Sequence, residues 1–168
     1  GVVIGEEYCP LGVDEAVIES LLDQVEEASP DVFVPYFAGA DQLTLLTQFT
    51  ERGLKKHIAV VMGHYDEVMA SNLSAEIREG FFSSNTYFMT VDTPSNHDFL
   101  ARLAKFPEVT GVWPHGNGTL TNFSEGAYIC VKAFAKAANL AGSVEPEALV
   151  EVLKTIDVDA PQGTGQMN

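Results

Sequence analysis

Apolar runs and helical stripes alternate along the first ninety residues, and this alternation limits the folds open to the chain. Short apolar segments that predict strands lie at residues 2–4, 32–38, 58–62 and 81–91. The run at 58–62 is uninterrupted, which is typical of a strand covered on both faces. Between these runs, apolar residues recur every three or four positions, as in an amphipathic helix. The pattern predicts an α/β fold in which helices flank a parallel sheet.

Each predicted helix in this part has its own start or stop signal. Asp14 can cap the first helix through its carboxylate, and Ser29-Pro30-Asp31 ends that helix. Gly53-Leu54 matches the glycine and apolar residue that commonly follow a helix. A third helix is expected to start within residues 63–66 and to close at Gly80.

Beyond residue 91 the pattern changes, and helices predominate. Thr93 can cap a helix that has Pro94 in its first turn. A helix rich in small residues is predicted at 127–138, where it suits close packing, and a last helix is predicted at 145–156. We therefore expect two domains, residues 1–91 and residues 92–168.

Two other stretches of the second part read as irregular. The Gly-, Asn- and Thr-rich stretch at 111–124 is predicted to be a loop. The tail at 163–168 is predicted to be mobile. Neither stretch carries a periodic apolar pattern, so neither is expected to form regular structure.

The charge balance excludes several classes of partner. The chain has 9 Lys and Arg residues against 24 Asp and Glu residues, a formal net charge of −15. Such a surface repels nucleic acid and anionic lipid. No apolar run approaches the roughly 20 residues of a membrane-spanning helix, so no direct membrane insertion is expected. The two cysteines, Cys9 and Cys130, cannot form a disulfide scaffold; buried free thiols are favoured, and a single bridge stays open.

The sequence offers no catalytic constellation. It lacks a Gly-x-Ser-x-Gly nucleophile motif, and Gly116-Asn117-Gly118 fails as a nucleotide-binding motif because Thr121 replaces the third glycine. No two histidines have metal-ligand spacing, so neither a metal site nor a cofactor is expected. Glu6 and Glu7 disfavour the reactive thiolate of Cys9. A binding scaffold that is not an enzyme is the favoured interpretation.

Aromatic and polar residues follow the predicted strands at their carboxyl ends. They are Tyr8, Phe37, Met62, Gly63, His64 and Tyr65. In a parallel sheet these ends share one edge, where open α/β folds bind ligands. Aromatic walls with a few polar tips suit a small polar solute. Packing of the aromatic residues is the alternative of equal weight, and for His64 a structural role at a helix start also stays open.

Four motifs occur in a fixed order along the chain: Gly5–Gly12, Pro30-Asp31-Val32, Asp92–Ser95 and Ile156–Gly163. In that order and spacing they resemble the second half of type I periplasmic binding proteins. The branch of urea and short-chain amide binders, related to the leucine/isoleucine/valine-binding proteins, is the most similar. The resemblance implies two Rossmann-like lobes. Residues 1–91 would then belong to the carboxy-terminal lobe, and the helices of residues 92–168 would return to the other lobe.

The resemblance also implies a function. It places ligand contacts at Phe37, Ala38, Gly39, Gly63, His64 and Tyr65. A small polar solute (an amide, urea or an amino acid) would be clamped between the lobes by hinge closure near Val91 and passed to an ABC permease. The protein would then work in the periplasm or at the cell surface. A ligand-sensing module with a signalling partner and an α/β enzyme with an unrecognised site remain the alternatives.

A partner surface follows from the same resemblance. A chain that holds one lobe would leave apolar faces around Phe134 and Leu153 without their usual neighbours. Exposed apolar patches promote association between copies. The expected consequence is a homodimer through this surface.

Overall fold

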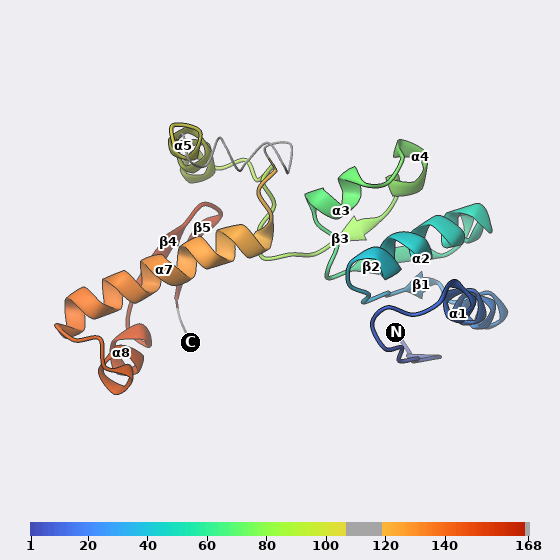
Figure 1. The fold of residues 1–168 in the computed structure, drawn as a ribbon, viewed down its shortest axis with the longest axis horizontal. Coiled ribbons are helices and arrows are strands. Elements are labelled where there is room, and N and C mark those ends of the chain that lie inside the picture. Colours follow the sequence, from blue (N-terminus) through green and yellow to red (C-terminus); the bar gives the residue numbers. More distant parts are fainter. Residues whose placement is uncertain (107–118, 167–168) are drawn as a thin grey trace. The chain divides into compact units, whose positions relative to one another are not determined.

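The computed structural model describes residues 1–106 and 119–166. The chain divides into two compact units, Gly1–Asn85 (unit 1) and Thr86–Asn168 (unit 2), which Figure 1 shows in blue to green and in yellow-green to red. The elements of unit 1 are α1 (Glu15–Ala28), β1 (Val32–Phe33), α2 (Ala40–Glu51), the 3-10 helix η1 (Leu54–Lys56), β2 (Ala59–Met62), α3 (Glu67–Ser71), α4 (Ala75–Arg78) and β3 (Phe82–Ser83). The described elements of unit 2 are α5 (Pro94–Leu103), α7 (Asn122–Ala141), α8 (Pro146–Leu153), β4 (Asp157–Ala160) and β5 (Gly163–Gln166).

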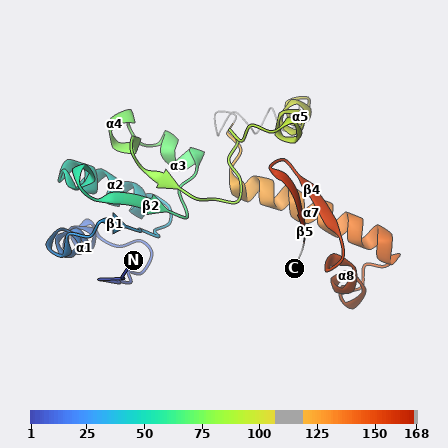
Figure 2. The same cartoon turned by 180° about the vertical axis from the view of Figure 1, so that it is seen from behind.

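Unit 1 contains the predicted parallel sheet, in the order β1-β2-β3 (Figure 2). Val32 pairs with Ala59, and Val61 pairs with Phe82. The outer strands are shorter than the predicted runs at 32–38 and 81–91, with two residues each. In β1 the reason is Pro35, which has no backbone N–H to donate to the ladder.

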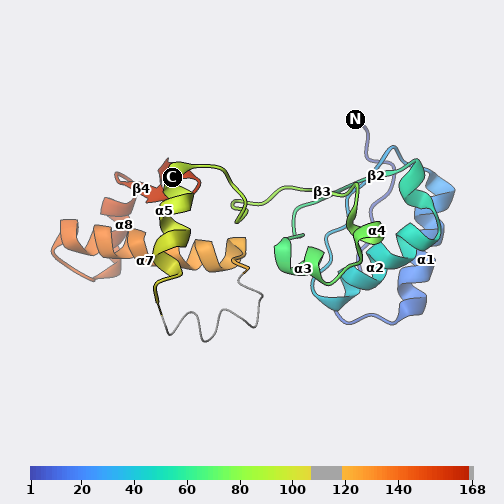
Figure 3. The same cartoon turned by 90° about the horizontal axis from the view of Figure 1, so that it is seen from above.

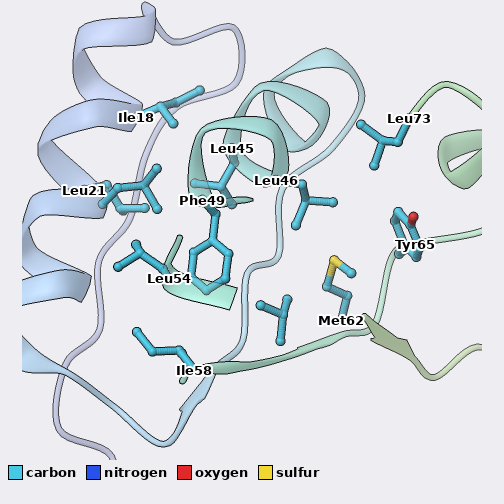
Figure 4. Packing of buried hydrophobic residues seen from close by; sticks show 12 residues of the cluster. Ile18, Leu21, Leu45, Leu46, Phe49, Leu54, Ile58, Met62, Tyr65 and Leu73 are labelled. Carbon is cyan, nitrogen blue, oxygen red and sulfur yellow. The ribbon is translucent and has the colours of Figure 1, made fainter. Parts of the chain in front are cut away.

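The core of unit 1 forms where α1 and α2 pack on the strands (Figure 4). Leu22 of α1 and Leu46 and Phe49 of α2 are fully buried, and Val60 and Met62 point into the same cluster from β2. Leu22, Leu46 and Phe49 fall on the helical stripes that the sequence predicts, and Val60 and Met62 fall in the predicted strand at 58–62. The helical periodicity of this segment therefore identified its buried face correctly.

Strand β2 is covered on one face, so the prediction of a strand buried on both faces is wrong. Val60 and Met62 are each 1% exposed, whereas Val61 is 37% exposed. Val32 and Phe82 are also exposed, at 48% and 62%. The described helices of unit 1 contribute their apolar residues to a single cluster, which leaves alternate residues of each strand facing solvent.

The amino-terminal segment is not a strand, contrary to the prediction for residues 2–4. Val2 is 87% exposed, and these residues pair with no strand of the described sheet. The segment is attached further along, where the backbone N–H of Gly12 donates to Asp41 Oδ2 at 2.7 Å. Asp14 occupies the N-cap position of α1, but its side chain makes no capping hydrogen bond. An apolar run alone does not make a strand, because a strand needs a neighbouring edge to pair with.

The third predicted helix is two short helices. Asp66 caps α3 by accepting the N–H of Met69 at 2.9 Å, as expected for a helix start near this position. Ser74 then caps α4 by accepting the N–H of Ile77 at 3.3 Å. A serine that bonds the backbone competes with the continuing helix, so the chain breaks between the two elements.

In unit 2 the predicted start of α5 is confirmed: Thr93 Oγ1 accepts the N–H of Asn96 at 3.0 Å, and Pro94 stands in the first turn. The small-residue helix is α7, which begins at Asn122, inside the stretch predicted as loop. Residues 111–118 of that stretch lie outside the described residues. Ala133 and Ala137 are buried against α8, which confirms the close packing expected of small side chains.

The carboxy-terminal residues form an antiparallel hairpin, β4–β5 (Figure 1), so the predicted mobile tail is wrong for residues 163–166. Strand β4 contacts α7, beside which it lies in Figure 3. The last helix, α8, ends at Leu153, and Ile156 is buried as the chain enters β4. Lys136 of α7 donates to the backbone carbonyl of Asp157 at 2.7 Å. The hairpin thus gains both a ladder and a connection to the helix, neither of which local composition reveals.

The two thiols are free, and their exposure differs from the prediction. Cys9 is half-buried, but Cys130 is exposed on α7. Phe134, on the same helix, is 51% exposed as expected, whereas Leu153 packs partly against the core of unit 2. Phe134 on α7 is therefore more exposed to solvent than Leu153 on α8.

Glu125 is a buried carboxyl group in the first turns of α7, with only 1% of its surface exposed. Burial raises the pKa of this group, and a hydrogen bond with Gln162 opposes the rise. The folded protein therefore binds more protons than the unfolded chain between the ordinary carboxyl pKa and the raised one. The free energy of unfolding falls as the pH rises through that interval.

We expect Glu125→Gln to raise the free energy of unfolding by about 1 kcal/mol at pH 8, because a neutral amide escapes the cost of burying a charge. The gain should vanish below the ordinary carboxyl pKa, where Glu125 is protonated in both states. Urea unfolding at pH values from 4 to 8 measures the difference, with the exposed Glu147→Gln as control. An equal gain at every pH would contradict this origin.

Candidate functional site

The loops that follow β1 and β2 lie next to each other at the carboxyl edge of the sheet. Continuing the register of these strands places Tyr36 opposite Gly63. The Tyr36 ring covers Gly63, since a Cβ atom added to that glycine would stand 3.4 Å from Tyr36 Cε2. Because Gly63 has no side chain, the two loops can lie close to each other at this point.

The structure places the six predicted contact residues on these two loops. The first loop carries Phe37, which packs partly against the core, and the exposed Ala38 and Gly39. The second loop carries the exposed Gly63, the half-buried His64 and the buried Tyr65. Loop geometry therefore brings together residues that are more than twenty positions apart in the sequence.

Tyr65 differs from the other five because its side chain is part of the core. It is 7% exposed and meets Phe81 edge to face, with ring centroids 6.3 Å apart. Burial raises the pKa of its phenol, and the positive charge of Arg78 opposes the rise. Its backbone carbonyl accepts hydrogen bonds from Ser83 Oγ at 2.5 Å and from Asn85 Nδ2 at 3.1 Å. These two bonds connect the loop after β2 to the end of β3.

Two of the aromatic and apolar residues predicted at the ligand edge do not line it. Met62 is 1% exposed and belongs to the core. Tyr8 is 85% exposed in the irregular amino-terminal segment, where its hydroxyl donates to Glu6 Oε1 at 2.5 Å. A shallow cavity of about 330 Å³ lies between that segment and α1, and none of the six predicted contacts lines it.

Tyr36 was not predicted as a ligand contact, although it is the most exposed aromatic side chain on the two loops. Its ring lies 5.7 Å from that of His64, centroid to centroid, with an angle of 43° between the planes. Tyr36 is 74% exposed. Its place inside an apolar run made it look like part of a strand, although Pro35 marks the point at which the ladder must end.

Gln42 was missed as well. Its side chain is completely buried beneath the two loops, in the first turn of α2. The signal was present in the sequence, because Gln42 continues the helical stripe formed by Leu45, Leu46 and Phe49. A polar residue at the start of a helix is usually exposed, and that expectation concealed it.

The charges on the two loops have one sign. Asp41, Asp66 and Glu67 lie on or directly after them, and residues 36–42 and 63–69 contain neither lysine nor arginine. Asp41 and Asp66 also serve structure, through the bonds to the N–H groups of Gly12 and Met69. The edge therefore favours ligands that present hydrogen-bond donors or a positive charge over anionic ligands.

Elsewhere, residues 1–106 and 119–166 contain no group of three His, Cys, Asp or Glu side chains able to hold a metal ion. His97 contacts Asp92 at 3.3 Å, and His57 is exposed. His115 and Gly116-Asn117-Gly118 lie outside the described residues. None of the described helices has both the length and the apolar character needed to cross a bilayer.

Solved structures of binding proteins share the fold. An amino acid ABC transporter substrate-binding protein from Pseudomonas fluorescens Pf-5 is 20% identical, with a TM-score of 0.70 over 90% of this chain and 38% of that one. A leucine-, isoleucine-, valine-, threonine-, and alanine-binding protein from Brucella ovis, in a closed conformation, is 16% identical, with a TM-score of 0.74 over 94% of this chain and 38% of that one. A branched chain amino acid ABC transporter periplasmic ligand-binding protein from Burkholderia xenovorans LB400 is 22% identical, with a TM-score of 0.66 over 86% and 36%.

These similarities confirm the predicted resemblance to type I periplasmic binding proteins, and this chain spans less than two fifths of the length of each of the three structures. The sequence profile of the periplasmic binding protein family matches residues 1–168. Since that match extends over every residue, the chain belongs to the periplasmic binding protein family.

Proposed function

We propose that this chain is the ligand-binding part of a solute-binding protein that delivers a small polar solute to an ABC permease. Family membership supports this function, as does the similarity of the fold to that of an amino acid ABC transporter substrate-binding protein. The single observation that carries it is the meeting of the two loops at the sheet edge, with Tyr36 exposed above Gly63 and beside His64. The protein would work in the periplasm or at the cell surface.

The ligand class follows from the chemistry of the two loops. Tyr36 and His64 supply aromatic surface, and the backbone of residues 37–39 and 63–65 supplies polar groups. The nearby carboxylates favour a solute with N–H donors, which an amino acid, an amide and urea all present. Amino acids are the class named for the similar structures. Binding of this kind needs no covalent step and no cofactor.

The mechanism that fits is hinge closure on the solute. The loops of unit 1 form one wall, and the opposite wall would come from the second lobe of a two-lobed protein. Closure buries the solute and satisfies its hydrogen-bonding groups within the protein. The closed form is then the state that a permease recognises.

A ligand panel on the full-length protein that contains these residues tests the proposal. L-leucine, L-alanine, acetamide and urea are screened by thermal shift, and binding is then measured by calorimetry. We expect at least one of them to raise the Tm by about 5 °C at a concentration of 100 Kd, because it binds only the folded form.

Alanine substitutions localise the binding. Tyr36→Ala and His64→Ala should each weaken it by about tenfold. Tyr8→Ala is the matched control, since Tyr8 is also a largely exposed tyrosine but lies away from the two loops. If no compound in the panel binds, the proposed function is wrong. If both loop variants bind like the parent protein, the site lies elsewhere.

A further inference from the structure

Gln42 stands out among the buried polar residues because it lies between the two loops of the proposed site. Its side chain has no exposed surface. A buried amide costs stability unless its donors and acceptor find partners. The partners of Gln42 therefore show what the residue does.

The Gln42 amide donates to both loops. In the orientation that satisfies its surroundings, its nitrogen donates to the backbone carbonyl of Phe37 and to that of His64, the latter at 3.3 Å. The alternative orientation offers only the weak acceptor Met62 Sδ, at 3.1 Å, and leaves the amide oxygen facing two carbonyl oxygens. The two-carbonyl arrangement is therefore the one that hydrogen bonding selects.

Both carbonyls lie where the sheet ladder has ended. Strand β1 ends at Phe33 and β2 ends at Met62, so Phe37 and His64 lie beyond the described strands. One NH₂ group, with its two donors, bridges the two loops at this point. It comes from a helix whose other buried residues hold it rigidly in the core, among them Leu45 and Leu46.

We infer that Gln42 is a positioning residue that sets the spacing between the two loops and thereby the affinity and selectivity of the site, without touching the solute. This inference rests on the proposed function. All six proposed contacts lie within two residues of Phe37 or His64, so a shift of either carbonyl displaces half of the contacts. A displacement of the contact residues by about one ångström is enough to weaken solute binding strongly.

The first test is Gln42→Met in the full-length protein. Methionine matches the length of glutamine but cannot donate to the carbonyls. For L-leucine, L-alanine, acetamide and urea, we expect binding weakened by about tenfold and a changed order of affinities. Gln48→Met is the matched control on the same helix, three residues before the helix ends and away from both loops, and it should leave the affinities within twofold.

The second test is Gln42→Glu, which separates positioning from folding. A protonated glutamic acid keeps one donor, whereas a carboxylate keeps none. The affinity of this variant, divided by that of the parent protein at the same pH, should be highest at pH 5, where one of the two hydrogen bonds can remain, and should be about tenfold below the parent value at pH 8. A merely structural role would change the Tm without this profile in samples that circular dichroism shows to be folded.

The outcomes separate the inference from the proposed function. If the parent protein binds none of the four compounds, the proposed function and the inference both fail. If the parent binds, but Gln42→Met keeps its affinities and Gln42→Glu shows a flat pH ratio, only the inference is overturned. If Gln42→Met does not fold, the pH ratio of Gln42→Glu alone decides, in either direction.

Discussion

Phe49→Ala is expected to lower the free energy of unfolding by about 3–5 kcal/mol, because it leaves a cavity at the centre of unit 1. Phe49 has no exposed surface, and its ring stacks on that of Phe33 with centroids 5.7 Å apart. This contact joins α2 to β1. Alanine at this position therefore loses both buried area and the connection between helix and sheet. Equilibrium urea unfolding followed by circular dichroism measures the effect.

Phe82→Ala is the matched control for Phe49→Ala. It removes the same side chain from the same unit, but Phe82 is 62% exposed on β3. We expect a loss below about 1 kcal/mol. Similar losses for the two variants would show that the cluster around Phe49 is not the core that stabilises this unit.

Asn96→Leu should destabilise unit 2 by about 3 kcal/mol, the second largest effect expected. Asn96 is 1% exposed, and its amide nitrogen donates to the backbone carbonyls of Met89 and Val91 at 3.0 and 2.9 Å. Its oxygen accepts the hydroxyl of Tyr87 at 2.8 Å. Leucine has a similar volume but removes all three hydrogen bonds from a buried position.

Two milder variants calibrate this result in the same urea experiment. Tyr87→Phe removes the hydrogen bond from the Tyr87 hydroxyl to Asn96 Oδ1 and should cost about 1 kcal/mol. Ser95→Ala changes an exposed neighbour on α5 and should stay within about 0.5 kcal/mol. If Asn96→Leu unfolds at the same urea concentration as Ser95→Ala, the network does not stabilise the segment before α5.

Local signals in the sequence predicted most of the helices and their limits. The cap at Thr93 with Pro94 in the first turn is confirmed, as is the buried stripe of α2. The same signals failed where pairing decided the outcome. Val2–Ile4 looks like a strand but pairs with none of the strands that the structure describes, and Gly163–Gln166 looks like a mobile tail but pairs with β4.

The candidate site was predictable in its location but not in its construction. Strand ends identified the loops with Phe37 and His64, since parallel strands place their carboxyl ends at one edge. They did not identify Tyr36, which depends on the strand register, or Gln42, which depends on two carbonyls that are 27 positions apart along the chain. Conversely, Tyr8 and Met62 also stand at the ends of predicted strands, but Tyr8 lies in the irregular amino-terminal segment and Met62 in the core.

By itself, the sequence determined that helices and strands alternate, where helices such as α1 and α5 begin, and which residues of α2 turn inward. Periodicity, caps and breakers act over a few neighbouring residues, so they can be evaluated without the rest of the chain. Only the tertiary structure decided which strands pair, which face of the sheet stays open, and that one buried amide spans the loops after β1 and β2. Those outcomes depend on contacts between residues far apart in the chain, whose free energies are settled only when the whole unit packs.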